Sequence, residues 1–101
     1  MHHRVDQPRS GSVVHLALGD TLEVLLRQRT TRHRWQVAMA PYGMHLLEDA
    51  PRAGTSGRRT ERRLMFRAMR DGGGILRLQR SLPSADDDAE EYVDLVVAVG
   101  R

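Results

Sequence analysis

Apolar and polar residues alternate in short stretches along most of the chain. In the clearest stretch, near the carboxyl end, Val93, Leu95, Val97 and Val99 occupy every second position. Because successive side chains of a β-strand point to opposite faces, this period of two predicts a strand with one buried face. The same pattern predicts further strands at 12–18, 21–26, 34–39 and 75–79.

Turn-forming residues separate these stretches. Gly19-Asp20 is a turn signal, and so short a connection predicts that the strands on either side pair as antiparallel neighbours. Asp71 to Gly74 predicts a hairpin-type turn. Longer connections are expected at 27–32, 51–57 and 81–90, and 44–48 is expected to be a short strand or an edge segment.

Residues 60–70 fit two periodicities. Leu64, Met65, Ala68 and Met69 would form an apolar stripe on a helix, whereas Leu64, Phe66 and Ala68 would form one face of a strand. We favour the strand because the neighbouring segments are strands.

Strands of this kind each leave one apolar face to cover, so two sheets must pack against each other. The predicted fold class is all-β, an immunoglobulin-like antiparallel β-sandwich of six to eight short strands. We expect a flexible N-terminal arm at residues 1–11 and one domain at residues 12–101. No apolar run approaches the roughly 18 residues that span a membrane, and no signal-peptide pattern is present. We therefore expect no membrane contact and a cytoplasmic location.

Composition excludes several kinds of chemistry. The chain has no cysteine, so it has no disulfide, thiol nucleophile or thiolate metal site. The five histidines lack metal-ligand spacing, and Asp86-Asp87-Asp88 lacks the spacing and the glycine of a calcium-binding loop. No Ser-His-Asp order or paired carboxylates indicate catalysis. We expect no catalytic residue, no metal and no cofactor, and hence a protein that is not an enzyme.

Charge is unevenly distributed. Residues 27–70 carry eleven arginines and three acidic residues, whereas residues 71–101 carry three arginines and seven acidic residues. A basic middle and an acidic end should partly neutralise each other, which weakens the case for a nucleic-acid partner. The four aromatic residues, most of which we expect to be buried, also offer no stacking platform for bases.

The most specific signal lies around the polar loop predicted at residues 27–32. Two strands flank the Gly19-Asp20 turn, the loop carries Thr30-Thr31, and the strand that follows carries Trp35, the single tryptophan. This arrangement resembles the opening of the chagasin family, small β-sandwich inhibitors of papain-like cysteine proteases. The first loop motif of that family is Asn-Pro-Thr-Thr-Gly, followed by an aromatic residue and tryptophan. In the matching segment 28–35 the two threonines and the tryptophan agree with the motif, and the Asn, Pro and Gly positions do not.

The resemblance covers about residues 13–100. The glycine-rich second motif corresponds to 54–60, and the family's next two strands correspond to 64–68 and 76–78, so the family layout also requires a strand at 60–70. The third motif, Arg-Pro-Trp, corresponds to 82–84, where only the proline agrees. The strands thus match the family better than the loop tips do.

The resemblance implies an inhibitor that inserts three loops, from one end of the sandwich, into the cleft of a papain-like cysteine protease. The first loop would cover the catalytic cysteine, and Trp35 would support that loop. Because the loop tips differ from the family, a non-inhibitory module that binds another acidic protein is an alternative, and a basic nucleic-acid binder is a less favoured one. We expect a monomer. The residues implied for partner binding are Arg29, Thr30, Thr31, Arg32, His33, Gly54, Thr55, Ser56, Gly57, Leu82, Pro83 and Ser84.

Overall fold

The computed structural model describes residues 1–28, 34–53, 60–81 and 91–100, and within these ranges it contains eight strands and no helix. The strands are β1 (His2–Asp6), β2 (Val13–Ala17), β3 (Thr21–Gln28), β4 (Arg34–Met39), β5 (Met44–Ala53), β6 (Thr60–Ala68), β7 (Gly72–Ser81) and β8 (Glu91–Gly100).

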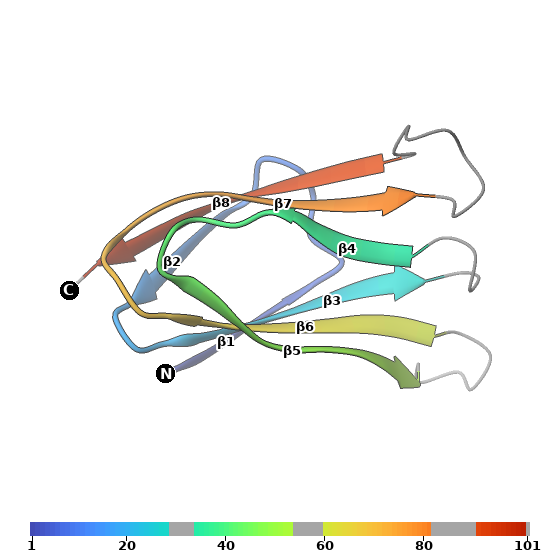
Figure 1. The fold of residues 1–101 in the computed structure, drawn as a ribbon, viewed down its shortest axis with the longest axis horizontal. Coiled ribbons are helices and arrows are strands. Elements are labelled where there is room, and N and C mark those ends of the chain that lie inside the picture. The colour runs from blue at the N-terminus through green and yellow to red at the C-terminus, as the bar shows by residue number, and fades with distance from the viewer. Residues whose placement is uncertain (29–33, 54–59, 82–90, 101) are drawn as a thin grey trace.

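Two four-stranded sheets form a sandwich (Figure 1). The first sheet has the order β1-β3-β6-β5, and the second sheet has the order β2-β8-β7-β4. The four strand pairs that do not involve β1 or β2 are antiparallel. The two other pairs are parallel: β1 pairs with β3 at one edge of the first sheet, and β2 pairs with β8 at one edge of the second sheet. The predicted all-β sandwich is confirmed, with these two parallel edges as an addition.

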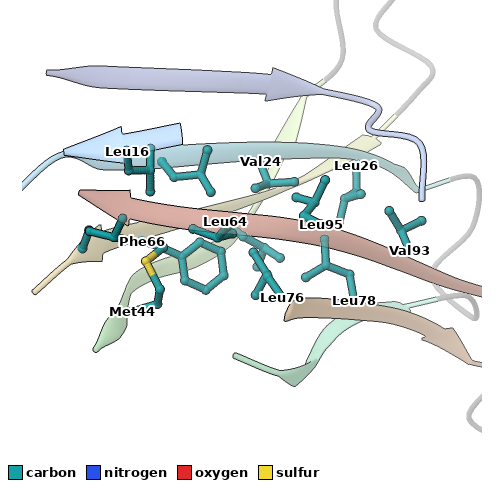
Figure 2. Close-up of a cluster of buried hydrophobic side chains, with 14 of the residues drawn as sticks. Leu16, Val24, Leu26, Met44, Leu64, Phe66, Leu76, Leu78, Val93 and Leu95 are labelled. Carbon is teal, nitrogen blue, oxygen red and sulfur yellow. The ribbon is translucent and has the colours of Figure 1, made fainter. Parts of the chain in front are cut away.

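The core lies between the sheets and is almost entirely aliphatic (Figure 2). Phe66 is fully buried within it, and burial of a side chain of this size contributes about 1.5–3 kcal/mol. The inward positions predicted for the last strand are all buried, so its period of two was interpreted correctly. The core residues are Leu16, Leu22, Val24, Leu26, Trp35, Met44, Leu64, Phe66, Ala68, Leu76, Leu78, Val93, Leu95, Val97 and Val99.

The ambiguous segment is a strand, as predicted. β6 lies between β3 and β5 in the first sheet. Leu64, Phe66 and Ala68 are fully buried, as the strand interpretation requires.

The strand pairing predicted across both turns was wrong, because each connection joins the two sheets instead. β2 pairs with β8 whereas β3 pairs with β1 and β6, so Gly19-Asp20 carries the chain from one sheet to the other. The chain likewise crosses between β6 and β7, and Gly72, Gly73 and Gly74 belong to β7. Alternation predicts which face of a strand is buried but not which strand lies beside it, since both sheets have the same period.

The loop predicted at 51–57 begins later than expected. β5 continues through Pro51 to Ala53, opposite β6. It is an edge strand, where a residue without a backbone N–H is tolerated. The rest of that predicted loop lies outside the described residues.

The flexible arm predicted at residues 1–11 is corrected, because His2–Asp6 form β1 along the edge of the first sheet. Only Val5 of this strand packs against the core, so the local sequence carries little strand signal. The strand is held by backbone pairing with β3, and beyond it the amide of Gln7 donates to the carbonyl of Leu25 at 2.9 Å. These partners are far away in the sequence, which is why the pattern did not predict them.

Candidate functional site

One end of the sandwich gathers the strand ends that flank the three predicted loops. In the first sheet, β3 ends at Gln28, β5 ends at Ala53 and β6 begins at Thr60. Gln28 and Ala53 both lie opposite Thr60 in the strand register, so these three strand ends are level.

The second sheet has the same arrangement. Arg34 at the start of β4 lies opposite Ser81 at the end of β7, and Glu91 at the start of β8 lies opposite Arg80. All six strand ends point to the same end of the molecule (Figure 1). The expectation that the three connections leave from one end of the sandwich is therefore met; we call this the loop end.

The residues that the resemblance implies for partner binding lie outside the described residues, in the segments 29–33, 54–59 and 82–90. Their roles stay predictions. They are Arg29, Thr30, Thr31, Arg32, His33, Gly54, Thr55, Ser56, Gly57, Leu82, Pro83 and Ser84.

Trp35 connects the two sheets at the loop end. Its side chain is 5% exposed and belongs to the core. The indole Nε1 donates a hydrogen bond to the backbone carbonyl of Arg27 at 3.0 Å. Since Trp35 lies on β4 and Arg27 on β3, this bond ties together the two strands that flank residues 29–33.

A row of three side chains crosses the second sheet at the same level. Arg80 of β7 lies opposite both Trp35 of β4 and Glu91 of β8. Its Cζ is 5.7 Å from the centre of the indole ring, and its Nη2 is 3.0 Å from Oε2 of Glu91. The ring face and the carboxylate both attract a guanidinium cation, so Arg80 is held from two sides.

This row lines a pocket of about 310 Å³ together with Gln7 and Arg27. The side-chain Oε1 of Gln7 accepts a hydrogen bond from the backbone N–H of Arg27 at 2.8 Å. The side chain of Arg27 is exposed. The pocket therefore presents two guanidinium groups and one carboxylate beside the loop end.

The sequence analysis did not single out this pocket, although part of its signal was present. Arg80 lies on the same face of its strand as the buried Leu76 and Leu78, and Glu91 lies on the same face as Val93. A charged residue at an inward position near a strand end is unusual and could have been noted. That β7 and β8 pair with Arg80 opposite Glu91 could not be derived from the pattern.

Two buried carboxylates lie away from the loop end, and the first, Asp20, follows the turn before β3. It accepts a hydrogen bond from the amide of Ala17 at 2.9 Å and one from the amino group of Met1 at 2.9 Å. His3 Nε2 lies 2.8 Å from its Oδ2. These contacts, the amide of Ala17 foremost, hold the pKa of Asp20 well below its ordinary value.

The second buried carboxylate, Glu23, faces arginines from both neighbouring strands. Its side chain bonds to Nε of Arg63 on β6 and lies 3.4 Å from Nε of Arg4 on β1. Burial acts to raise the pKa of Glu23, but the hydrogen bond and charge of Arg63, with the charges of Arg4 and His2, outweigh burial and lower it. Both carboxylates are thus engaged in holding β1 and β3 together.

No group of three His, Asp or Glu side chains is placed to hold a metal ion within the described ranges. The described residues also include no helix that is long and apolar enough to cross a membrane.

Two of the four aromatic side chains are on the surface, which corrects the expectation that most are buried. Tyr42 is 80% exposed and Tyr92 is 50% exposed. Each ring is covered by an arginine, with the Cζ of Arg70 at 4.7 Å from the centre of Tyr42 and that of Arg77 at 5.3 Å from Tyr92. Tyr42 lies in the β4–β5 connection and Tyr92 near the start of β8, at opposite ends, so they form no continuous stacking platform.

No family model matches the sequence, and no curated protein matches it in a sequence search. Solved structures do match the fold. The crystal structure of the cysteine protease inhibitor EhICP2 from Entamoeba histolytica superposes with a TM-score of 0.81 at 17% identity, over 98% of this chain and 95% of that chain. The chain has the fold of this inhibitor. The solution structure of amebosin matches with a TM-score of 0.69 at 20% identity, over 99% of both chains.

The match covers both chains almost completely, so the likeness extends over the whole sandwich. The resemblance to the chagasin family that the sequence indicated therefore extends to the chagasin-like fold as a whole. At these identities the likeness concerns the fold, and the activity has to be argued from the loop end.

Proposed function

We propose that the protein inhibits papain-like cysteine proteases by inserting three loops from the loop end into the protease cleft. The observation that carries this proposal is that all six strand ends flanking segments 29–33, 54–59 and 82–90 lie at one end of a fold shared with a cysteine protease inhibitor. These segments together form one composite binding edge.

The rigid base of these segments favours binding. Each segment begins and ends on a strand that is paired in a sheet, and the Trp35–Arg27 hydrogen bond fixes the base of the first segment. A base that is ordered before binding lowers the entropy lost on association. The strands that carry the three segments are therefore in place before the protein meets the protease.

Within the first segment, Thr30 and Thr31 occupy the positions of the family's two threonines and cover the catalytic cysteine of the target. Arg29 and Arg32 add charge-assisted hydrogen bonds to acidic groups on the protease surface. Leu82, Pro83 and Ser84 occupy the third motif without its tryptophan, and a lost hot-spot anchor costs roughly 2 kcal/mol or more. We therefore expect affinities weaker than those of an inhibitor with all three intact motifs.

The test is a titration of several papain-like proteases with the purified protein. We expect inhibition constants in the nanomolar to micromolar range. Thr31→Ala should weaken inhibition, and Arg32→Gly should strengthen it because glycine adopts positive φ without strain. Arg70→Gly, a matched loss of an exposed arginine at the other end, should leave inhibition unchanged. No inhibition at tens of micromolar by any variant would contradict the proposal.

The changed loop tips favour one second candidate, a module that binds an acidic protein without inhibiting a protease. Arg32 stands where the family has glycine, and Leu82 and Ser84 stand where it has arginine and tryptophan. Capture of an acidic partner that is not a protease, lost when Arg29 and Arg32 are replaced, would favour this function over inhibition.

A further inference from the structure

We propose that the pocket lined by Gln7, Arg27, Trp35, Arg80 and Glu91 is a docking site for a carboxylate side chain of a partner protein. Apart from Trp35, which the family resemblance assigns to the support of the first loop, none of these residues belongs to the three loop motifs. The inference therefore goes beyond the proposed function, and it holds whether or not the partner is a protease.

The charge of the pocket favours a single negative charge. Arg27 and Arg80 contribute two positive charges and Glu91 one negative charge, so the pocket has a net charge of about +1. Among the described residues Arg27 makes no ion pair. A carboxylate neutralises the site, whereas a doubly charged phosphate would leave an excess negative charge beside Glu91.

The geometry of Arg80 favours the fork-shaped contact that carboxylates make. The indole of Trp35 and the carboxylate of Glu91 fix the guanidinium from opposite sides, so little side-chain entropy remains to be lost on binding. Arg27 is exposed and can turn toward an incoming group.

The size and place of the pocket favour a protein side chain as its occupant. A volume of about 310 Å³ lies near the lower end of the range for small-molecule pockets, about 300–1,000 Å³, and suits one side chain better than a cofactor. Arg27 and Trp35 lie two positions from segment 29–33, Arg80 lies two positions before segment 82–90, and Glu91 directly follows it. A protein docked on the loop end would reach the pocket without any rearrangement of the sandwich.

Trp35 is the single tryptophan, so its fluorescence reports on this pocket alone. The probe is a blocked Gly-Glu-Gly tripeptide, compared with blocked Gly-Gln-Gly, which has the same shape and no charge. We expect a saturable change in Trp35 fluorescence with the Glu peptide, with a dissociation constant of about 1–10 mM, and none with the Gln peptide. Arg27→Gln and Arg80→Gln should each weaken binding about tenfold or more.

Arg67→Gln is the matched control, because it removes the same charge from an exposed position of β6 opposite Thr21, away from the loop end. It should change the dissociation constant by less than about twofold. Arg27 is exposed, so Arg27→Gln carries the test even if Arg80→Gln fails to fold. An equal response to both peptides, an equal loss in Arg67→Gln, or no saturation by the Glu peptide would overturn the proposal.

Discussion

At the scale of single residues, the backbone of β8 leaves no room for a side chain at Gly73. It has a φ of +120°, and a Cβ added there would overlap the carbonyl oxygen of Val97. Gly72 has a similar φ of +108°, but a Cβ there would meet nothing within 4 Å. An alanine would therefore be strained by the positive φ at both positions, but it would clash with β8 only at position 73.

Gly72→Ala should lower the free energy of unfolding by about 1–2 kcal/mol, through strain at positive φ. Gly73→Ala should lower it by about 1–3 kcal/mol more, because β8 must move to admit the methyl group. Urea unfolding of both variants measures the difference. Equal losses would mean that β7 and β8 do not approach each other as described.

Trp35 is the residue on which the loop end depends. Trp35→Phe removes the indole N–H and leaves the carbonyl of Arg27 without that donor. We expect a loss of about 1–3 kcal/mol in the free energy of unfolding, from the lost hydrogen bond and the smaller ring. Tyr42→Phe, a change at an exposed ring, should stay within about 0.5 kcal/mol. If the two variants were equally stable in thermal or urea unfolding, the bond would contribute nothing.

At the scale of elements, the sequence predicted strand faces well and strand neighbours poorly. The inward residues of β8 follow from local alternation, whereas those of β6 also needed the neighbouring strands to exclude a helical stripe. The crossing of Gly19-Asp20 between sheets and the pairing of β1 with β3 depend on partners far away in the chain. Pro51 favours a loop on composition alone, whereas its place in β5 depends on the sheet order, which makes β5 an edge strand.

The buried carboxylates beside β1 make stability depend on pH. The pKa values of Asp20 and Glu23 are lowered from ordinary values of 3.8 and 4.5. The unfolded chain therefore binds more protons than the folded chain at about pH 3–5, so stability rises with pH in this window. The contribution is present above the ordinary pKa values and is lost as the pH falls toward the lowered ones.

Glu23→Gln should reduce stability at pH 6 and should also reduce the further loss of stability between pH 6 and pH 3. Asp6→Asn, at an exposed carboxylate on β1, should leave that pH dependence unchanged. Urea unfolding at a series of pH values measures both. A Glu23→Gln variant with the same pH dependence as the unaltered protein would refute the role of this carboxylate.

At the scale of the whole molecule, several charged side chains pair across neighbouring strands. Arginines of β6 and β7 meet acidic residues on adjacent strands, but none of these pairs joins the basic middle (27–70) to the acidic end (71–101), which the sequence analysis expected to neutralise each other. The pairs are Arg62–Asp49, Arg63–Glu23, Arg77–Asp94 and Arg80–Glu91. The family resemblance also implied that the three connections share one end, whereas the pocket beside them required the registers of β7 with β4 and β8.

The most direct measurement of protease inhibition through the loop end is the rate at which iodoacetamide alkylates the catalytic cysteine of a papain-like protease. With the protein in excess over its inhibition constant, we expect the rate to fall about tenfold or more, because the first loop covers the cysteine. A Tyr42→Ala variant, altered at the opposite end, should protect equally well. An unchanged alkylation rate at saturating protein would contradict the account.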